Sequence, residues 1–437
     1  MKKFIIPLAV GAVAVSAFLG GCFVTSGSDG ADGKDGQNAS ALQFYELAKS
    51  EGLVSSVDEF LSKYLNYTPD ELNNALSLQR TMNYSLRSGV SLAAQFTSRT
   101  GGGSTSFGSG VVVDFDEATG ETYIVTNCHV IYNDASREIY AEDIYCYLYG
   151  HDNDYNSVEN RFKASVIGAS VEYDIALLKA SGGVYKDEAE FDLKAAKPVA
   201  ASFSENDDVF VGEEVYAVGN AEAQGMSVTR GFITKERETV SLNLSDRFPK
   251  VSEYYNDYSV IRTDAAINEG NSGGALFGRD GSIKAIVNAK VSSEGVESMG
   301  YALPASNVKR LVQLMRDSYN TKGFSPSDAS LTRAHLSAGT ESKTQLSYWN
   351  EEKGVTELRE KIVVTESDGV LEVGDTIRKI KITDGSGRTI EERAVERSYH
   401  LEDTLLSARN GYTVTLTVSR GGELKEVRPE ITFKTFK

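Results

Sequence analysis

Clustered positive charge is missing from this sequence. Its 437 residues include 45 Lys and Arg against 62 Asp and Glu, which gives a formal net charge of −17, and the basic residues are grouped no further than in pairs. A nucleic-acid partner needs a basic face, so the sequence argues against nucleic-acid binding. The acidity instead suits an exported protein that has to stay soluble.

Proline and tryptophan are also scarce, with 7 Pro and a single Trp, whereas the sequence has 40 Gly, 22 Tyr and 18 Phe. This balance is typical of many strands and tight turns rather than of long helical bundles. A content of 41% hydrophobic and 24% charged residues is ordinary for a globular protein. The sequence therefore predicts a mainly β fold, with enough length for two or three domains.

The amino terminus is typical of an export signal. Two lysines precede residues 4–19, an uncharged apolar run that is short for a membrane span. The run ends in Leu19-Gly20-Gly21-Cys22, which resembles the lipobox of bacterial lipoproteins. We expect residues 1–21 to be a signal peptide and Cys22 to carry the lipid that anchors the chain to the extracytoplasmic face of a membrane. A plain cleaved signal with a chance cysteine is the alternative.

We predict that residues 22–40 form a flexible tether, because residues 26–40 have almost no apolar side chains and cannot build a hydrophobic core. A helical segment is predicted for residues 41–88. Its apolar positions between residues 41 and 65 recur at helical intervals, with a break at Glu51-Gly52. A second helix should start where Thr68 can cap and Pro69 can take the first position, and it should run toward Arg87.

Cysteine is scarce as well, with only three in the chain. If Cys22 is lipidated, Cys128 and Cys146 remain, 18 positions apart in what read as neighbouring strands. A disulfide between them would be worth about 3 kcal/mol in the chain-entropy model. Two free thiols are the alternative, and the sequence leaves both open.

Three segments in the middle of the chain carry residues suited to nucleophilic catalysis. His129 follows a long apolar strand, Asp174 stands at the head of an aliphatic run, and Ser272 is flanked by glycines that let its backbone expose the hydroxyl. The segments resemble the hallmark motifs of the HtrA/Deg branch of trypsin-like serine proteases, in the order His, Asp, Ser; as they stand here they read Thr126-Asn127-Cys128-His129-Val130, Asp174-Ile175-Ala176-Leu177-Leu178 and Gly270-Asn271-Ser272-Gly273-Gly274.

The resemblance implies a trypsin-like double β-barrel protease domain over residues 89–320. In it, His129 would act as general base toward Ser272, Asp174 would orient the imidazole, and the backbone N–H groups of Gly270 and Ser272 would form the oxyanion hole. No metal and no cofactor is required. One departure is Glu269, where the family usually has Pro, and it flanks the oxyanion loop.

By the same resemblance, the primary substrate pocket is formed around three short segments, none of which contributes an acidic wall residue. We therefore expect a small or medium aliphatic side chain, such as Val, Ala or Leu, rather than Lys or Arg before the scissile bond. The expected pocket residues are Ala266, Ile267, Val287, Asn288, Gly300, Tyr301 and Ala302.

The carboxy-terminal part resembles a PDZ domain, predicted as an α+β domain over residues 328–437. A helix capped within residues 305–307 should close the protease domain, and residues 319–330 read as a linker. Residues 369–377 resemble the PDZ Gly-Asp turn, followed by a helix at 401–408 and a hairpin at 412–432. No carboxylate-binding loop is identifiable between residues 331 and 349, so peptide capture stays open beside a purely structural cap.

These features favour the prediction of a lipid-anchored serine endopeptidase that cleaves unfolded or damaged exported polypeptides. A protease fold that binds peptides without cleaving them, with Glu269 distorting the oxyanion loop, is one alternative; a surface structural or adhesive protein is another. Relatives of this type commonly form homotrimers, and the sequence leaves the oligomeric state open. The short Gly/Ser-rich loop at residues 97–106 does not indicate assembly into cages.

Overall fold

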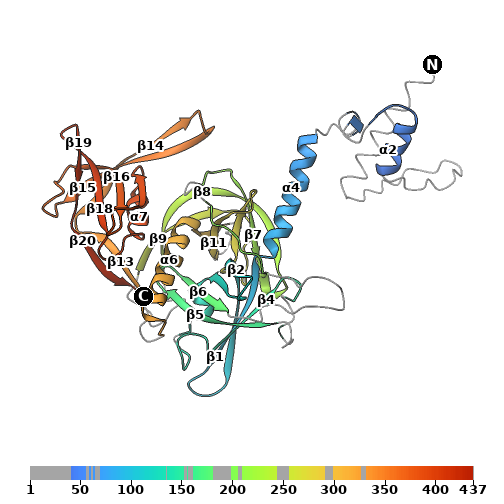
Figure 1. Ribbon diagram of the computed structural model, residues 1–437, viewed down its shortest axis with the longest axis horizontal. Helices are drawn as coiled ribbons and strands as arrows, with labels where there is room; N and C mark the ends of the chain where they lie inside the picture. Colours follow the sequence, from blue (N-terminus) through green and yellow to red (C-terminus); the bar gives the residue numbers. More distant parts are fainter. Residues whose placement is uncertain are drawn as a thin grey trace. The chain divides into compact units, whose positions relative to one another are not determined.

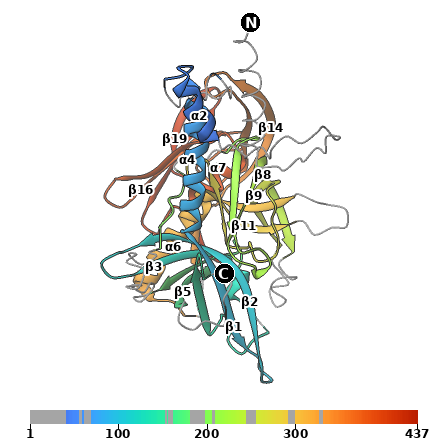
Figure 2. The same ribbon diagram turned by 90° about the vertical axis from the view of Figure 1, so that its right-hand side faces the viewer.

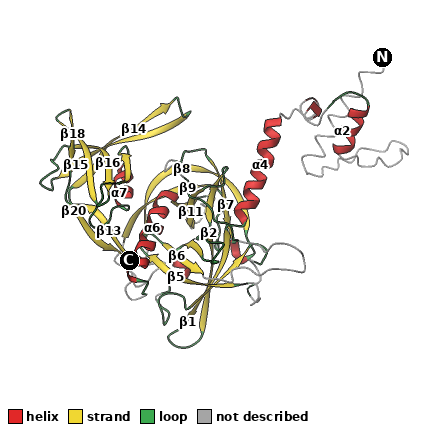
Figure 3. Ribbon diagram, viewed as in Figure 1, coloured by secondary structure: helices red, strands yellow, loops and turns green. Residues whose placement is uncertain are grey.

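The computed structural model describes residues 41–55, 59, 60, 63, 69–133, 135–151, 155, 161–180, 198–204, 209–243, 255–290, 299–325 and 331–436. The chain divides into two compact units, Met1–Arg80 and Thr81–Lys437. The expected signal peptide, Cys22 and the tether at 22–40 lie outside the described residues. Strands dominate the second unit (Figure 3), which confirms the mainly β prediction.

Helices α2 and α4 precede the strands. The first, α2 (Ala41–Ser50), ends before Gly52, whose φ of +66° breaks the helix where the sequence predicted. The second, α4 (Pro69–Leu86), starts at the predicted proline and ends beside Arg87. Among the described residues, no helix combines the length and the apolar character needed to cross a membrane.

The first barrel is closed by six antiparallel strands in the order β1-β2-β3-β6-β5-β4 (Figures 1 and 2). Alternate residues of its first strand, Val90, Leu92, Ala94 and Phe96, enter the core, which is the period expected of a strand with one face inward. The strands are β1 (Gly89–Thr97), β2 (Gly103–Phe115), β3 (Thr122–Thr126), β4 (Asp143–Leu148), β5 (Phe162–Ser170) and β6 (Ile175–Ala180).

The second barrel repeats this connectivity, with the strand order β10-β11-β12-β9-β8-β7. Its core includes Val215, Ile233, Ile261, Leu276 and Val287. Two barrels of the same topology confirm the predicted double β-barrel. The strands are β7 (Glu214–Gly219), β8 (Ser227–Asn243), β9 (Tyr255–Thr263), β10 (Ala275–Gly278), β11 (Ile283–Lys290) and β12 (Gly300–Pro304).

Helix α6 (Ala305–Lys322) follows the second barrel directly and packs back onto the first. Val308, Leu311 and Met315 are buried along one side, and a Cβ on Gly168 of β5 would lie 2.5 Å from the Cβ of Met315. The helix starts at Ala305 with Pro304 as its N-cap, so residues 305–307 lie in the first turn and do not form the predicted cap. It also includes residues 319–322, which were expected in the linker, and it ends at Gly323, whose φ is +73° and whose N–H donates to the Tyr319 carbonyl.

The carboxy-terminal domain is built from antiparallel strands and one helix. Strands β14, β15, β16, β18 and β19 form one sheet in that order, β17 adds to β16, and β13 pairs with β20. The predicted hairpin at 412–432 is present as β18 and β19, but the helix begins at Ser398, three residues before the predicted start. The elements are β13 (Leu331–Leu336), β14 (Gly339–Asn350), β15 (Val355–Glu366), β16 (Thr376–Thr383), β17 (Thr389–Ala394), α7 (Ser398–Leu405), β18 (Thr413–Arg420), β19 (Glu423–Val427) and β20 (Ile431–Phe436).

A buried ion pair joins this domain to the second barrel. Arg237 of β8 contacts Asp403 of α7 with Nη2 and Oδ2 3.0 Å apart, and both side chains are more than 90% buried. Asn307 of α6 donates to the other oxygen of Asp403 at 2.8 Å. Because an unpaired charge buried at this site would be costly, these contacts define how the domain docks.

His400 of α7 makes the stability of the carboxy-terminal domain depend on pH. Burial, aided by the nearby charge of Arg393, lowers the pKa of His400 from 6.5 to about 3. The residue is 7% exposed, and its ring stays neutral in the folded chain over this range, while the unfolded chain takes up a proton as the pH falls below 6.5. The folded state thus loses up to about 1.4 kcal/mol per pH unit from this group as the pH falls from 6.5 toward 3.

The variant His400→Gln removes this titration and should flatten the dependence. We expect its free energy of unfolding, measured by urea denaturation at several pH values, to fall less steeply between pH 6.5 and 4 than that of the wild type. Equal slopes for the two proteins would show that His400 does not titrate as its surroundings imply.

Candidate active site

Asp174 lies in the turn between β5 and β6 and is fully buried. Its Oδ2 is 2.7 Å from His129 Nδ1, and its Oδ1 accepts the backbone N–H of His129 at 2.8 Å. The amide of Asn288 donates to the same Oδ2 at 2.8 Å. A carboxylate removed from water needs such donors. The two bonds to His129 also hold its imidazole in place from the Nδ1 side.

The local backbone explains why these groups meet. Asp174 has a φ of +50°, a left-handed conformation that is unusual for a residue other than glycine and that turns the chain sharply into β6. The buried Asn127, just before the short helix α5 (Cys128–Ile131), donates its side-chain amide to the Asp174 carbonyl at 2.8 Å. That bond ties the turn to the segment that carries His129.

Ser272 is partly exposed in the loop between β9 and β10. Its hydroxyl donates to the backbone carbonyl of Asn288 at 3.4 Å, and its own carbonyl accepts the N–H of Ser109 at 2.9 Å. Within the described part of the chain, no hydrogen bond joins the hydroxyl to the imidazole of His129. A series of direct bonds nevertheless links the three predicted residues: Ser272 to Asn288, Asn288 to Asp174, and Asp174 to His129.

Gly270 is held in place from three sides. It has a φ of +91°, and a Cβ at this position would lie 2.2 Å from the carbonyl oxygen of Asn220. Its own carbonyl accepts the hydroxyl of Ser109 at 2.6 Å. The preceding carbonyl, that of Glu269, accepts the N–H of Glu222 at 2.7 Å. Only glycine fits here, and the orientation of the two peptide groups is set by donors from outside the loop.

Ser109, Asn220 and Asn127 are site residues to which the sequence reasoning gave no role. The Ser109 hydroxyl, fully buried in β2, accepts the N–H of Asn220 at 2.8 Å while it donates to Gly270. The side chain of Asn220 donates to Ser91 and accepts the N–H of Gly225. The sequence pattern that could have identified Ser109 and Asn220 is a polar residue next to glycine within an apolar run, as in Gly108-Ser109-Gly110 and Gly219-Asn220.

The expected pocket residues divide into two groups. Ile267, Val287 and Ala302 are buried in the core of the second barrel, and a Cβ on Gly300 would lie 2.4 Å from Ile267 Cδ1, so the isoleucine covers Gly300. Ala266 is exposed and Tyr301 is partly exposed. The side chain of Asn288 is directed at Asp174 rather than toward open space.

The two remaining cysteines are separate buried thiols. The expectation that they lie on neighbouring strands is wrong, because Cys128 follows β3, which pairs with β2 and β6, whereas Cys146 lies in β4 between β1 and β5. Of the two alternatives left open, the structure therefore contains the free thiols and not the disulfide. Burial, with a further contribution from the Asp174 charge, raises the pKa of Cys128 well above its ordinary value.

The carboxy-terminal domain reaches the residue just before Asp174. Tyr173 hydrogen-bonds Arg333 of β13 through its hydroxyl, and its ring packs edge-on against Phe436 of β20 with centroids 5.5 Å apart. Burial raises the pKa of Tyr173 to about 12. The turn that presents Asp174 is thus supported by both the first barrel and the last strand of the chain.

No cluster of His, Cys, Asp and Glu side chains suited to a metal ion occurs within the described ranges. The site itself presents the hydroxyl of Ser272, the imidazole of His129, the carboxylate of Asp174 and nearby backbone N–H groups. These are the parts that nucleophilic acyl transfer uses.

Residues 108–286 match the family model of the trypsin-like peptidase domain. The matched segment runs from β2 to β11 and contains His129, Asp174 and Ser272. The two barrels are thus similar to a trypsin-like peptidase domain.

Within this class, the predicted resemblance to HtrA/Deg-type serine proteases is confirmed. The chain is 31% identical over 211 residues to Serine protease Do-like HtrA of Bacillus subtilis (strain 168), in an alignment that covers 48% of this chain and 39% of that protein. It is 26% identical over 335 residues to Serine protease Do-like HtrA of Lactococcus lactis subsp. lactis (strain IL1403), with 73% and 69% covered. The chain spans less than two-fifths of the length of the Bacillus relative.

Among solved structures, the chain is similar to an HtrA-type protease, AlgW, with a tripeptide. The TM-score is 0.48 at 23% sequence identity, and the alignment covers 82% of this chain and 97% of that one.

The steric restraint on Gly270 can be separated from its backbone preference. Gly270 and Gly212 have nearly equal φ values of +91° and +88°, but nothing lies within 4 Å of a Cβ at Gly212. We expect Gly270→Ala to lower the free energy of unfolding by about 1–3 kcal/mol more than the matched control Gly212→Ala. Urea denaturation of both variants measures the difference, and equal effects would mean that the loop moves away from Asn220 without cost.

Proposed function

We propose that this protein is a serine endopeptidase in which Ser272 is the nucleophile, His129 the general base and Asp174 the residue that orients the imidazole. The observation that carries the proposal is the hydrogen-bonded series from Ser272 through Asn288 and Asp174 to His129. It brings side chains from both barrels to one place, with the carboxylate buried and the hydroxyl partly exposed to a substrate.

The proposed reaction starts when the Ser272 hydroxyl leaves the Asn288 carbonyl and donates to His129. Contacts of this kind are often loose before substrate binds. The oxygen then attacks the scissile carbonyl while the imidazole takes the proton, and the buried carboxylate of Asp174 stabilises the resulting cation. The proton passes to the leaving amine, an acyl-enzyme remains, and water releases it through the same steps.

An oxyanion hole is proposed at the backbone N–H groups of Gly270 and Ser272. Among the described residues, neither group donates a hydrogen bond to the protein. The carbonyl of Glu269 is bound by the N–H of Glu222. This contact supports the same proposal, since it turns the carbonyl of the Glu269–Gly270 peptide group toward Glu222 and its N–H the opposite way. The loss of one such donor typically costs about 3 kcal/mol in the barrier.

A preference for small or medium aliphatic side chains is proposed for the primary pocket. The support is that Ile267 covers Gly300, which narrows the space, and that none of the seven expected pocket residues is acidic. A long basic side chain would find neither the depth nor a counter-charge there.

We further propose that the enzyme is anchored through Cys22 to the extracytoplasmic face of a membrane and acts on unfolded or damaged exported proteins. The support is the Leu19-Gly20-Gly21-Cys22 motif, the polar stretch that follows it, and a DegP-like relative from Buchnera aphidicola described as a probable periplasmic endoprotease. The carboxy-terminal domain is proposed to be PDZ-like and to tune substrate access. A homotrimer stays an expectation.

One observation favours a second candidate function, a protease fold that binds peptides without cleaving them. In the described structure, the Ser272 hydroxyl donates to the Asn288 carbonyl and not to the imidazole. If this arrangement persists when a peptide binds, the serine is not activated.

The variant Ser272→Ala separates the two functions. We expect the native protein to react with a fluorophosphonate probe and to cleave casein after Val, Ala or Leu, and the variant to lose the labelling and at least about 1,000-fold in rate. The control Ser347→Ala removes an exposed hydroxyl on β14 and should keep both activities. A native protein that is neither labelled nor active on casein would favour the binding function.

The role of Ser109 is tested against its neighbour Ser91. Both hydroxyls are fully buried and bind Asn220, but only Ser109 also binds Gly270. We expect Ser109→Ala to lower kcat/KM for a peptide substrate about 10- to 100-fold, because it frees the oxyanion loop, and Ser91→Ala to stay within about threefold of the wild type. Comparable losses in both variants would assign Ser109 a purely structural part.

A further inference from the structure

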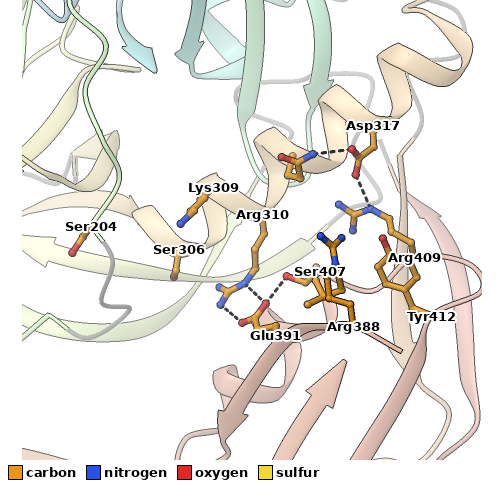
Figure 4. A pocket seen from close by; sticks show the side chains of 12 residues that line it. Ser204, Ser306, Lys309, Arg310, Asp317, Arg388, Glu391, Ser407, Arg409 and Tyr412 are labelled. Atoms are coloured by element: carbon orange, nitrogen blue, oxygen red, sulfur yellow. Dashed lines mark hydrogen bonds and ion pairs between the residues drawn. The ribbon is translucent and has the colours of Figure 1, made fainter. Parts of the chain in front are cut away.

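A cavity of about 660 Å³ lies between α6 and the carboxy-terminal domain (Figure 4), apart from the site around Ser272. This volume is in the range of sites for small molecules. The lining is largely polar, with hydroxyl, amide and charged groups. The lining residues are Ser204, Ser306, Lys309, Arg310, Gln313, Asp317, Arg388, Ile390, Glu391, Ser407, Arg409 and Tyr412.

The walls come from opposite sides of the domain junction. On α6, Ser306, Arg310, Gln313 and Asp317 are spaced so that they share one face of the helix. The facing wall comes from the β16–β17 turn, β17 and the segment after α7 (Figure 4). A molecule in the cavity would therefore contact both domains.

Each carboxylate in the lining is already neutralised by the protein. Glu391 accepts Nε and Nη2 of Arg310 at 3.2 and 2.5 Å and the Ser407 hydroxyl at 2.5 Å. Asp317 accepts Arg409 Nε at 3.1 Å and the Gln313 amide at 2.8 Å. Two arginines thus balance two carboxylates, and these bonds also hold the walls in position.

What remains is an excess of positive charge. Lys309 has no ion pair with any residue that the structure describes, and Arg388 pairs only with Asp384 of its own turn while 75% of its side chain is exposed. Among the lining residues, four cationic side chains therefore face two anionic ones, in a chain whose net charge is −17, and Asp384, which is not part of the lining, offsets part of the charge of Arg388.

We propose that this cavity is a binding site for a small polyanion that carries phosphate or carboxylate groups. Lys309 and Arg388 would supply the charge, and the hydroxyls of Ser306 and Tyr412 would donate further hydrogen bonds. Charge-assisted bonds of this kind are roughly twice as strong as neutral ones, and arginine matches the planar geometry of both anion types. A bound anion would join α6 to the carboxy-terminal domain.

The test is isothermal titration of the whole chain with inorganic tripolyphosphate and, separately, with citrate. We expect saturable binding at one site, and at least a tenfold loss of affinity in the double variant Lys309→Gln/Arg388→Gln. Binding of tripolyphosphate alone would assign the site to phosphate compounds, and binding of citrate alone to polycarboxylates; either result supports the proposal.

A matched control removes the same charge elsewhere on the carboxy-terminal domain. Arg359 and Lys381 are about half exposed and lie outside the cavity, so Arg359→Gln/Lys381→Gln should change the affinity less than twofold. An equal loss in both double variants, or no saturable binding of either probe, would overturn the proposal. Because neither probe reports on proteolysis, this outcome is independent of the proposed function.

Discussion

The burial of one carboxylate is the constraint on which the rest of this structure depends. Asp174 is fully removed from water, and a charge in that position is tolerated only if donors surround it. The donors come from separate parts of the chain: the ring and backbone of His129 from the first barrel, and the Asn288 amide from the second. The need to satisfy Asp174 therefore brings the two barrels together at the place where the proposed chemistry occurs, and the burial of the carboxylate keeps water from weakening its hold on the imidazole.

The carboxy-terminal domain is part of the same support. Its strands β13 and β20 contact Tyr173, the residue before Asp174, through Arg333 and Phe436. The buried pair of Arg237 with Asp403 leaves the domain little freedom to dock elsewhere. Any shift would separate the two side chains and leave each buried charge without its partner. A domain that could act merely as a tethered module is instead packed against the turn that presents the carboxylate. Any rearrangement of the junction would thus be felt one residue from the proposed site.

The mainly β character followed from composition, and the double barrel followed from the resemblance of three motifs to HtrA/Deg-type proteases; the structure confirms both. The roles of His129, Asp174 and Ser272 came from the same resemblance and stay a proposal, which the bonds of Asn288 to Ser272 and Asp174 support. The orientation of Asn288, which was expected in the pocket wall, could not be predicted from the sequence. Its side-chain amide is directed by a hydrogen bond to Asp174, which lies 114 residues away in the chain. The strands of Cys128 and Cys146 were also misplaced, because proximity along the chain says nothing about the order of strands in a closed barrel. Helix ends were off by three or four residues where capping was weak, as at α7, whose N-cap makes no side-chain bond.

The departure at Glu269 can be understood from the backbone rather than from the side chain. A proline usually stands at this position in the family that the motifs resemble, and it restricts the loop covalently. Here the restriction comes from the facing segment: Glu222 donates its N–H to the Glu269 carbonyl, while Glu222 and its neighbour Ala223 have φ values of +53° and +54°. Two such residues cost on the order of 1–3 kcal/mol each, and the contacts around Asn220 have to offset that strain. The loop that carries Gly270 is therefore held by a neighbour that is itself under strain, so its geometry depends on the packing around it more than on its own sequence.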